Sequence, residues 1–170
     1  MTNPTEIIPG VLFYSYLSTV RKDKVGFFEH NTLVLQVSGH FMLETATERI
    51  SMNAGEMLLI RKNQLGEITK TPPEGGDYQT IVIILKEDLI REIALEQQIE
   101  MPGKYTGPAN ILLPENDFLH GYFQSVIPYV RHSGKHHGYP GYAESERRDP
   151  ITAAYHARAQ GIFIRLLRTA

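Results

Sequence analysis

The 170-residue sequence contains no cysteine, which excludes disulfides, thiolate metal ligands and cysteine nucleophiles. It also has little excess charge: the formal net charge is −2, so the chain lacks the basic surface that nucleic-acid binding requires. The longest uninterrupted apolar run, residues 81–85, is too short to span a bilayer. The first ten residues lack the basic and apolar regions of a signal peptide. We therefore expect a cytoplasmic protein that does not itself contact DNA or membrane.

The first half of the chain has the pattern of antiparallel β-structure. Short runs rich in β-branched residues alternate with Gly, Asn and Pro, at the spacing typical of sandwiches and barrels. The predicted strands are residues 11–17, 32–38, 41–45, 48–52, 56–60, 67–70 and 78–85. The last of these is apolar throughout, which predicts that both of its faces are covered.

The second half changes to helical periodicity. Helices are predicted at about 86–98, 117–130 and 150–169, with a mobile, His- and Gly-rich loop at 131–148. The last helix has a clear start, because Asp149 is a good N-cap and Pro150 suits the first helical position. Strands followed by helices predict a single α+β domain. It would consist of an arm (1–10), an antiparallel β-barrel (11–85) and a helical part (86–170) packed on one side of the barrel.

The turns of the predicted barrel resemble those of the cupin superfamily, in which two motifs are marked by glycines. Gly39 and Gly55 fit those places, with 15 residues between them. The resemblance also identifies where cupin metal ligands would stand. The first-motif glutamate position is Thr32 and the second-motif histidine position is Gly66, neither of which binds metal well. The resemblance therefore implies a cupin-like barrel without metal, cofactor or enzymatic activity.

An ordered set of motifs narrows the resemblance further. QVSG, NAGEMLLIRKN, PPEGG and IVIILKEDLIREIA follow one another as in the N-terminal sensor domain of AraC-family transcriptional regulators, in the branch similar to the type III secretion activators. The resemblance covers about residues 10–95, is weaker over 116–130, and departs at 131–148, which is longer and more polar than in the family. It implies a homodimeric, effector-sensing regulatory domain whose effector is a small molecule or a regulatory protein. It also implies a helix-turn-helix DNA-binding domain that is absent from these 170 residues.

Two alternatives stay open. One is a stand-alone, metal-free cupin that binds a small molecule. The other, less favoured, is a cupin enzyme, which would need several histidines and a carboxylate around one cavity. The histidines of the 131–148 loop (His132, His136 and His137) are not preorganised in such a Gly-rich segment, so we predict no metal site there.

Candidate functional residues follow from strand and helix periodicity. Alternation in the 32–38 strand places four residues on the face toward the barrel interior, where their polar groups need partners or a ligand: Thr32, Val34, Gln36 and Ser38. Arg61, at the barrel rim, is either an anion contact for an effector or part of a solvated turn. The apolar stripe of the last helix is either domain core or a dimer seam, and consists of Tyr155, Ala159, Ile162, Phe163 and Leu166.

Overall fold

The computed structural model describes residues 4–23, 26–96, 98, 105–114 and 116–133. The chain divides into two compact units. The first comprises Met1–Glu87 and Tyr105–Asn116, and the second comprises Asp88–Lys104 and Asp117–Ala170. The first unit contains every strand found in the described residues, and each unit is described by itself below.

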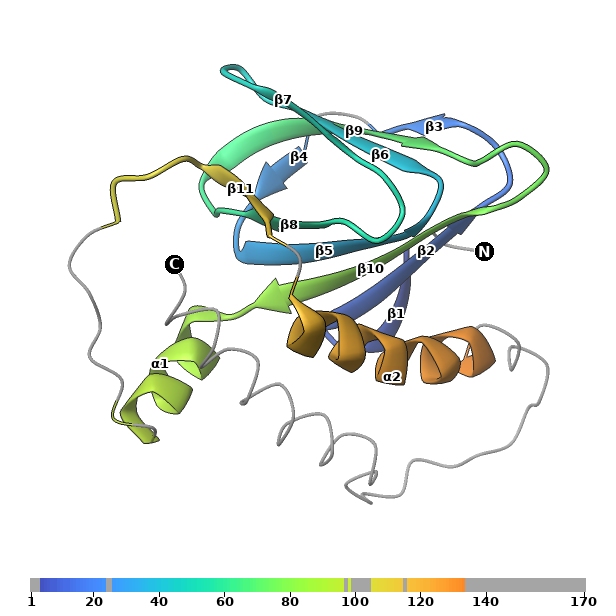
Figure 1. Ribbon diagram of the computed structural model, residues 1–170. Helices are drawn as coiled ribbons and strands as arrows, with labels where there is room; N and C mark the ends of the chain where they lie inside the picture. The colour runs from blue at the N-terminus through green and yellow to red at the C-terminus, as the bar shows by residue number, and fades with distance from the viewer. Residues whose placement is uncertain (1–3, 24–25, 97, 99–104, 115, 134–170) are drawn as a thin grey trace. The chain divides into compact units, whose positions relative to one another are not determined.

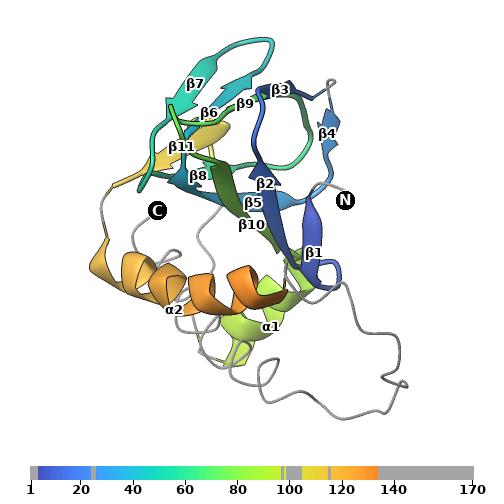
Figure 2. The ribbon, with the colours of Figure 1, turned by 90° about the vertical axis from the view of Figure 1, so that its right-hand side faces the viewer.

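The first unit is built from two antiparallel sheets that face each other (Figures 1 and 2). Its strands are β1 (Thr5–Ile8), β2 (Leu12–Leu17), β3 (Arg21–Lys22), β4 (Gly26–Phe28), β5 (Asn31–Ser38), β6 (His40–Glu44), β7 (Arg49–Met52), β8 (Met57–Ile60), β9 (Gln64–Thr71), β10 (Tyr78–Leu85) and β11 (Asn110–Leu113). The first sheet has the order β1-β2-β10-β5-β8-β11, and the second has the order β3-β9-β6-β7, with β4 also paired to β9.

No strand pairing joins the two sheets within the described residues, so the observed architecture is a sandwich. The predicted antiparallel β-structure is confirmed. Closure into a barrel and the packing of helices on one side stay predictions.

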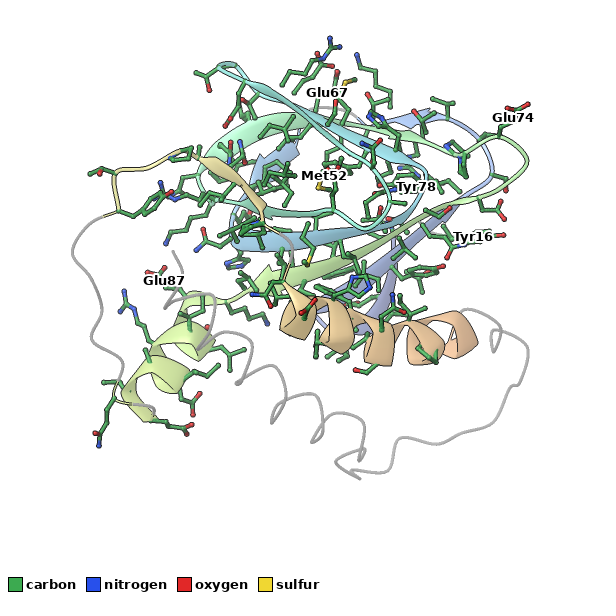
Figure 3. All side chains as sticks on the ribbon, viewed as in Figure 1. Tyr16, Met52, Glu67, Glu74, Tyr78 and Glu87 are labelled. Carbon is green, nitrogen blue, oxygen red and sulfur yellow. The ribbon has the colours of Figure 1, made fainter. Side chains whose placement is uncertain are left out.

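An apolar core fills the space between the sheets. Strand alternation explains its composition, because every second residue of a strand points to the same face. The buried members are Val34, Phe41, Leu43, Met52, Leu58, Ile60 and Tyr78, and they come from both sheets. Figure 3 shows the labelled Met52 and Tyr78 between the sheets. Burying each large side chain stabilises the fold by about 1.5–3 kcal/mol, which makes this core the main source of the sandwich's stability.

Both faces of the central strands are covered. On β5, Leu33 and Leu35 belong to the face opposite Val34, yet each is at least 96% buried. Their cross-strand partners on β10, Ile83 and Ile81, are buried as well. The prediction that residues 78–85 form a strand covered on both faces is therefore confirmed.

The predicted strands all occur, with boundaries shifted by at most three residues. Four strands were not predicted: β1, within the expected irregular arm; β3, within an expected basic turn; β4; and β11, inside the range 86–170 that was expected to be helical. These strands have two to four residues, too few to show alternation, so only pairing with β2, β8 or β9 defines them.

Two helices are described, α1 (Glu87–Glu96) and α2 (Asp117–Ser133), close to the predicted 86–98 and 117–130. Helix α2 continues through Pro128, so the first three residues of the predicted 131–148 loop are helical. The rest of that loop and the predicted helix at 150–169 lie outside the described residues. None of the described helices is long and apolar enough to cross a membrane.

Glycine is required at two places in the sandwich for different reasons. Gly39 forms the turn between β5 and β6 with a φ of +84°, and a Cβ there would lie 2.5 Å from the Thr71 carbonyl oxygen. Gly66 has ordinary backbone angles but faces the core, where a Cβ would lie 2.7 Å from Leu43 Cδ1 and 2.9 Å from Phe28 Cε2. Gly66, the position of a cupin metal ligand, is therefore filled by core packing.

Gly66→Ala is expected to lower the free energy of unfolding by about 1–3 kcal/mol, because the added methyl group overpacks the core. The matched control is Gly26→Ala on the neighbouring strand. Gly26 is the cross-strand partner of Gly66, and a Cβ there would meet nothing within 4 Å. The control should change stability by no more than about 0.5 kcal/mol. Urea denaturation followed by circular dichroism measures both, and equal effects would contradict the packing at Gly66.

Candidate functional site

A row of polar side chains crosses the first sheet on its inner face. Ser15, Thr80 and Gln36 stand on the adjacent strands β2, β10 and β5, and register makes them direct cross-strand neighbours. Each is at least 98% buried. Buried hydroxyl and amide groups cost about 1–3 kcal/mol each when they lack a partner, so their hydrogen bonds decide whether a ligand is needed.

The Gln36 side chain is satisfied within the protein. Its Oε1 accepts a hydrogen bond from Thr80 Oγ1 at 2.5 Å, and its Nε2 donates to the Ser38 carbonyl at 2.7 Å. The second bond forms because β5 bulges there: Ser38 pairs with Gln79 and Gln36 with Thr80, which leaves Val37 out of register. The Gln36 side chain therefore has protein partners at both its oxygen and its nitrogen.

The other predicted interior residues also have protein surroundings. Thr32 is buried and its Oγ1 donates to the His30 carbonyl at 3.1 Å. Val34 is part of the apolar core, and Ser38 is half-buried. The predicted inward orientation of this face is thus confirmed for Val34 and Gln36. Ligand binding by the four residues stays a prediction.

Arg61 follows β8 at the opposite end of that strand from Met57, away from the Gln36 row. Its guanidinium carbon lies 4.7 Å from the centre of the Tyr105 ring, and its backbone N–H donates to the Ala109 carbonyl at 3.0 Å. A cation–π contact of this kind stabilises by about 0.5–1 kcal/mol at an exposed site. The structure therefore gives Arg61 a part in holding residues 105–109, and an anion contact there stays a prediction. Asn63, two residues further on, adopts a φ of 66°, a conformation that asparagine tolerates in turns.

A second polar network fixes β11 to the sandwich. Asn110, 4% exposed, donates through Nδ2 to Glu48 Oε1 at 2.6 Å and to Gln64 Oε1 at 3.0 Å. Its Oδ1 accepts from Gln64 Nε2 at 2.9 Å. Asn110 lies on the first sheet, whereas Gln64 begins β9 of the second, so the network joins the two sheets. The segment between α1 and α2 is thereby anchored in the sandwich.

The most unusual group inside the sandwich is Lys70 on β9. It shares the inward face with Gly66 and Ile68, and its side chain is only 9% exposed. Its Nζ lies 2.9 Å from Asp23 Oδ2, and the other Asp23 oxygen accepts from Arg21 Nε. A buried charge requires such a partner, because removing it from water costs several kcal/mol. The Asp23 carboxylate thus bridges two cations.

The charges around Asp23 change how it titrates. Partial burial alone would raise the pKa of the Asp23 carboxyl, but the hydrogen bonds and positive charges of Lys70 and Arg21 outweigh burial and hold this pKa below its usual range. Asp23 therefore stays ionised through mildly acidic conditions. Its backbone N–H also donates to the Ile68 carbonyl at 2.8 Å, which fixes the carboxylate beside Lys70.

Tyr78, at the start of β10, lies in the same end of the interior. Its side chain is fully buried, and its hydroxyl is near the Thr80 side chain. Burial raises the pKa of the phenol strongly; the nearby Thr80 hydroxyl opposes this rise, and the negative charge of Asp23 adds to it. Tyr78 is therefore a neutral O–H donor at physiological pH, close enough to Asp23 to sense its charge.

Metal-ligating residues do not gather in the described residues: no group of three His, Asp, Glu or Cys side chains is placed to hold an ion there. Two of the cupin ligand positions are instead committed to structure. Thr32 uses its hydroxyl on a backbone carbonyl, and Gly66 is packed against Leu43 and Phe28.

Sequence reasoning did not single out Lys70, Asp23 or Tyr78. Alternation in the predicted 67–70 strand contained part of the signal, because Lys70 falls on the same face as Ile68. Asp23 lies in a turn that meets β9 only in the folded chain, 47 residues away in sequence from Lys70. Tyr78 was recognised only as the first residue of a buried strand.

Asp23→Asn is expected to lower the free energy of unfolding by about 1–3 kcal/mol near neutral pH, because it leaves the Lys70 ammonium buried without an ionic partner. Lys70→Met, which removes the charge and keeps the volume, should cost less than about 1.5 kcal/mol. The exposed Lys22–Glu67 pair supplies the control: Glu67→Gln should change stability by less than about 1 kcal/mol. Urea denaturation gives all three values, and Lys70→Met costing more than Asp23→Asn would contradict this account.

The same pair predicts a pH dependence. A carboxyl whose pKa is lower in the folded state stabilises the fold above its unfolded pKa of about 3.9, and this contribution is lost as the pH falls through the folded pKa. Over that acidic range the stability of Asp23→Asn should fall less steeply than that of the unsubstituted chain. Parallel pH profiles of the two proteins, measured by urea denaturation, would contradict the assignment.

The chain is similar in sequence and in structure to known regulatory proteins. Residues 31–138, more than half of the chain, match the ExsA N-terminal regulatory domain. No curated protein sequence matches the chain. Among solved structures, an apo ToxT variant from Vibrio cholerae superimposes with a TM-score of 0.60 at 8% identity, covering 94% of this chain and 56% of that one. The chain thus spans little more than half the length of ToxT.

Two cupin structures are similar to about half of the chain. The CENP-C cupin domain of Drosophila melanogaster has a TM-score of 0.40 at 15% identity, covering 48% of this chain and 65% of that one. A cupin superfamily protein from Desulfitobacterium hafniense has a TM-score of 0.38 at 11% identity, covering 46% and 72%. At such identities the solved structures describe the fold, whereas the sequence match over 31–138 shows the family. The chain belongs to the ExsA N-terminal regulatory domain family of AraC-type transcription regulators, the group that its motifs resemble.

Proposed function

We propose that this chain is the effector-sensing and dimerisation part of an AraC-type regulator. It would have no enzymatic activity, metal or cofactor, and would act in the cytoplasm. It would reach DNA only through a helix-turn-helix domain outside these 170 residues. The net charge of −2 supports the assignment of DNA binding to another domain, because a domain that binds DNA directly needs an excess of basic residues.

The observation that carries the proposal is the position of β11 in the chain. The strand lies between α1 and α2 in sequence, yet it pairs with β8 and is held by the Asn110–Glu48–Gln64 network. Both helices are therefore covalently tied to a strand whose position depends on the sandwich. The family match supports treating them together, since residues 31–138 include both helices and β5 to β11.

The mechanism would be a shift between two arrangements. An effector, either a small molecule or a regulatory protein, would bind one arrangement of the sandwich better than the other and so change its population. The predicted dimer stripe (Tyr155, Ala159, Ile162, Phe163 and Leu166) would carry that state to the DNA-binding domain. By linkage, dimerisation and effector binding would then alter each other by the same factor.

The proposal is tested by joining the chain to a DNA-binding domain that represses a reporter gene only as a dimer. The unsubstituted chain is expected to repress. Ile162→Asp should abolish repression because it places a charge in the apolar seam, whereas Gln160→Asp, beside the stripe, should leave repression unchanged. Light scattering on the purified proteins checks that the loss follows dissociation. A monomeric unsubstituted chain, or equal repression by both variants, would contradict dimerisation by this helix.

A further inference from the structure

The turn between β8 and β9, residues 61–64, is hydrogen-bonded to three separate parts of the chain. Three consecutive backbone N–H groups make these bonds: Arg61 donates to the Ala109 carbonyl at 3.0 Å, Lys62 to Asn31 Oδ1 at 2.9 Å and Asn63 to the Phe28 carbonyl at 2.7 Å. Gln64 Nε2 donates back to the Arg61 carbonyl at 2.7 Å and so closes the turn. The backbone of the turn therefore has a fixed place at this end of the first unit.

Two neighbouring side chains of the same turn hold two further residues of the first unit. The Lys62 ammonium is paired with the Glu87 carboxylate. The Arg61 guanidinium carbon lies 4.7 Å from the centre of the Tyr105 ring. These two partners flank residues 88–104: Glu87 is the last residue before that segment, and Tyr105 is the first residue after it. One turn thus holds the chain at both ends of the segment.

Each of these side-chain contacts is weak by itself, because water reaches both. The Lys62 and Glu87 side chains are 37% and 52% exposed, and Tyr105 is 38% exposed. An exposed contact of either kind shifts an equilibrium by only about twofold to fivefold. Yet both contacts start from one turn. When one end of residues 88–104 is released, the other end explores more space, so its effective concentration at the turn falls. Each contact therefore favours the other.

We propose that residues 61–64 form a clamp on residues 88–104, which opens and closes at both ends of that segment together. Lys62 holds the end from which α1 continues, and Arg61 holds the end that leads to β11. The weakness of the single contacts suits such a device, because a clamp that moves must open at a small cost in free energy. The sandwich strands need not unfold for this opening, since neither side-chain contact belongs to the apolar core.

The backbone bonds of the turn give the clamp an input. Phe28 ends β4 and Asn31 begins β5, so a displacement of the connection between these strands would move the turn through its bonds to both. The two side-chain contacts would then change at the same time. In the proposed regulator this would carry a change in the sandwich to the start of α1. The clamp itself is a property of the purified chain, so its test does not depend on dimerisation.

The test reads each end of the segment separately and breaks the contact at the opposite end. The chain has no tryptophan, so Tyr105→Trp supplies a single fluorophore at one end and keeps an aromatic ring for Arg61. Hydrogen exchange of the α1 amides, measured by mass spectrometry, reads the other end. Lys62→Met, added to Tyr105→Trp, should increase acrylamide quenching of the indole. Arg61→Met should speed α1 exchange by about twofold to fivefold.

Two further variants test the same contacts by another route. Glu87→Gln breaks the ion pair from its other side and should reproduce the effect of Lys62→Met. Asn31→Ala removes the acceptor of the Lys62 N–H and should change both readouts, because it loosens the turn itself. Unchanged readouts in Asn31→Ala would contradict the input through β5.

The matched control is Lys22→Met, which removes an exposed ammonium paired with Glu67 and should change neither readout. Exchange of the central amides of β5 and β10 should stay the same in every variant. The clamp is overturned if Lys62→Met affects only α1 and Arg61→Met affects only the indole, since the contacts are then independent. It is equally overturned if neither readout changes, if the control acts as strongly, or if the central strands exchange faster to the same extent as α1.

Discussion

The sandwich depends on one constraint: polar groups enclosed between its two sheets must find partners there, because water does not reach them. Most of the interior is apolar and has no such groups; Val34, Leu58 and Ile60 are examples. The buried polar side chains form specific hydrogen-bonded pairs. Gln36 is satisfied by Thr80 and by a bulge in its own strand, and Asn110 by Gln64 and Glu48. These bonds fix the register of strands that the apolar contacts alone would not specify.

Lys70 differs from these buried polar residues because it carries a charge. A charged lysine on the inner face of a strand destabilises the fold unless a carboxylate pairs with it. Asp23 supplies that carboxylate from a turn beside β3. Tyr78, at the start of β10, is fully buried in the same interior, and burial raises the pKa of its phenol.

At two positions where the cupin resemblance would place metal ligands, the residues pack or hydrogen-bond within the fold. Gly66 is pressed against Leu43 and Phe28, and Thr32 bonds a backbone carbonyl. The same strands instead serve as a frame for β11, which the Asn110 network holds between the two helices of the chain.

The sequence alone determined the strands from residue 11 to 85, the first two helices, the family and the inward face of β5, because these depend on local periodicity and on ordered motifs. It also predicted that Thr32 and Gly66, at the cupin ligand positions, bind metal poorly. Only the tertiary structure decided that Asp23 meets Lys70, that Asn110 joins Glu48 and Gln64, and that residues 110–113 form a strand. The physical reason is that these contacts join residues far apart in the chain. No local sequence pattern predicts which turn will supply the partner of a buried charge.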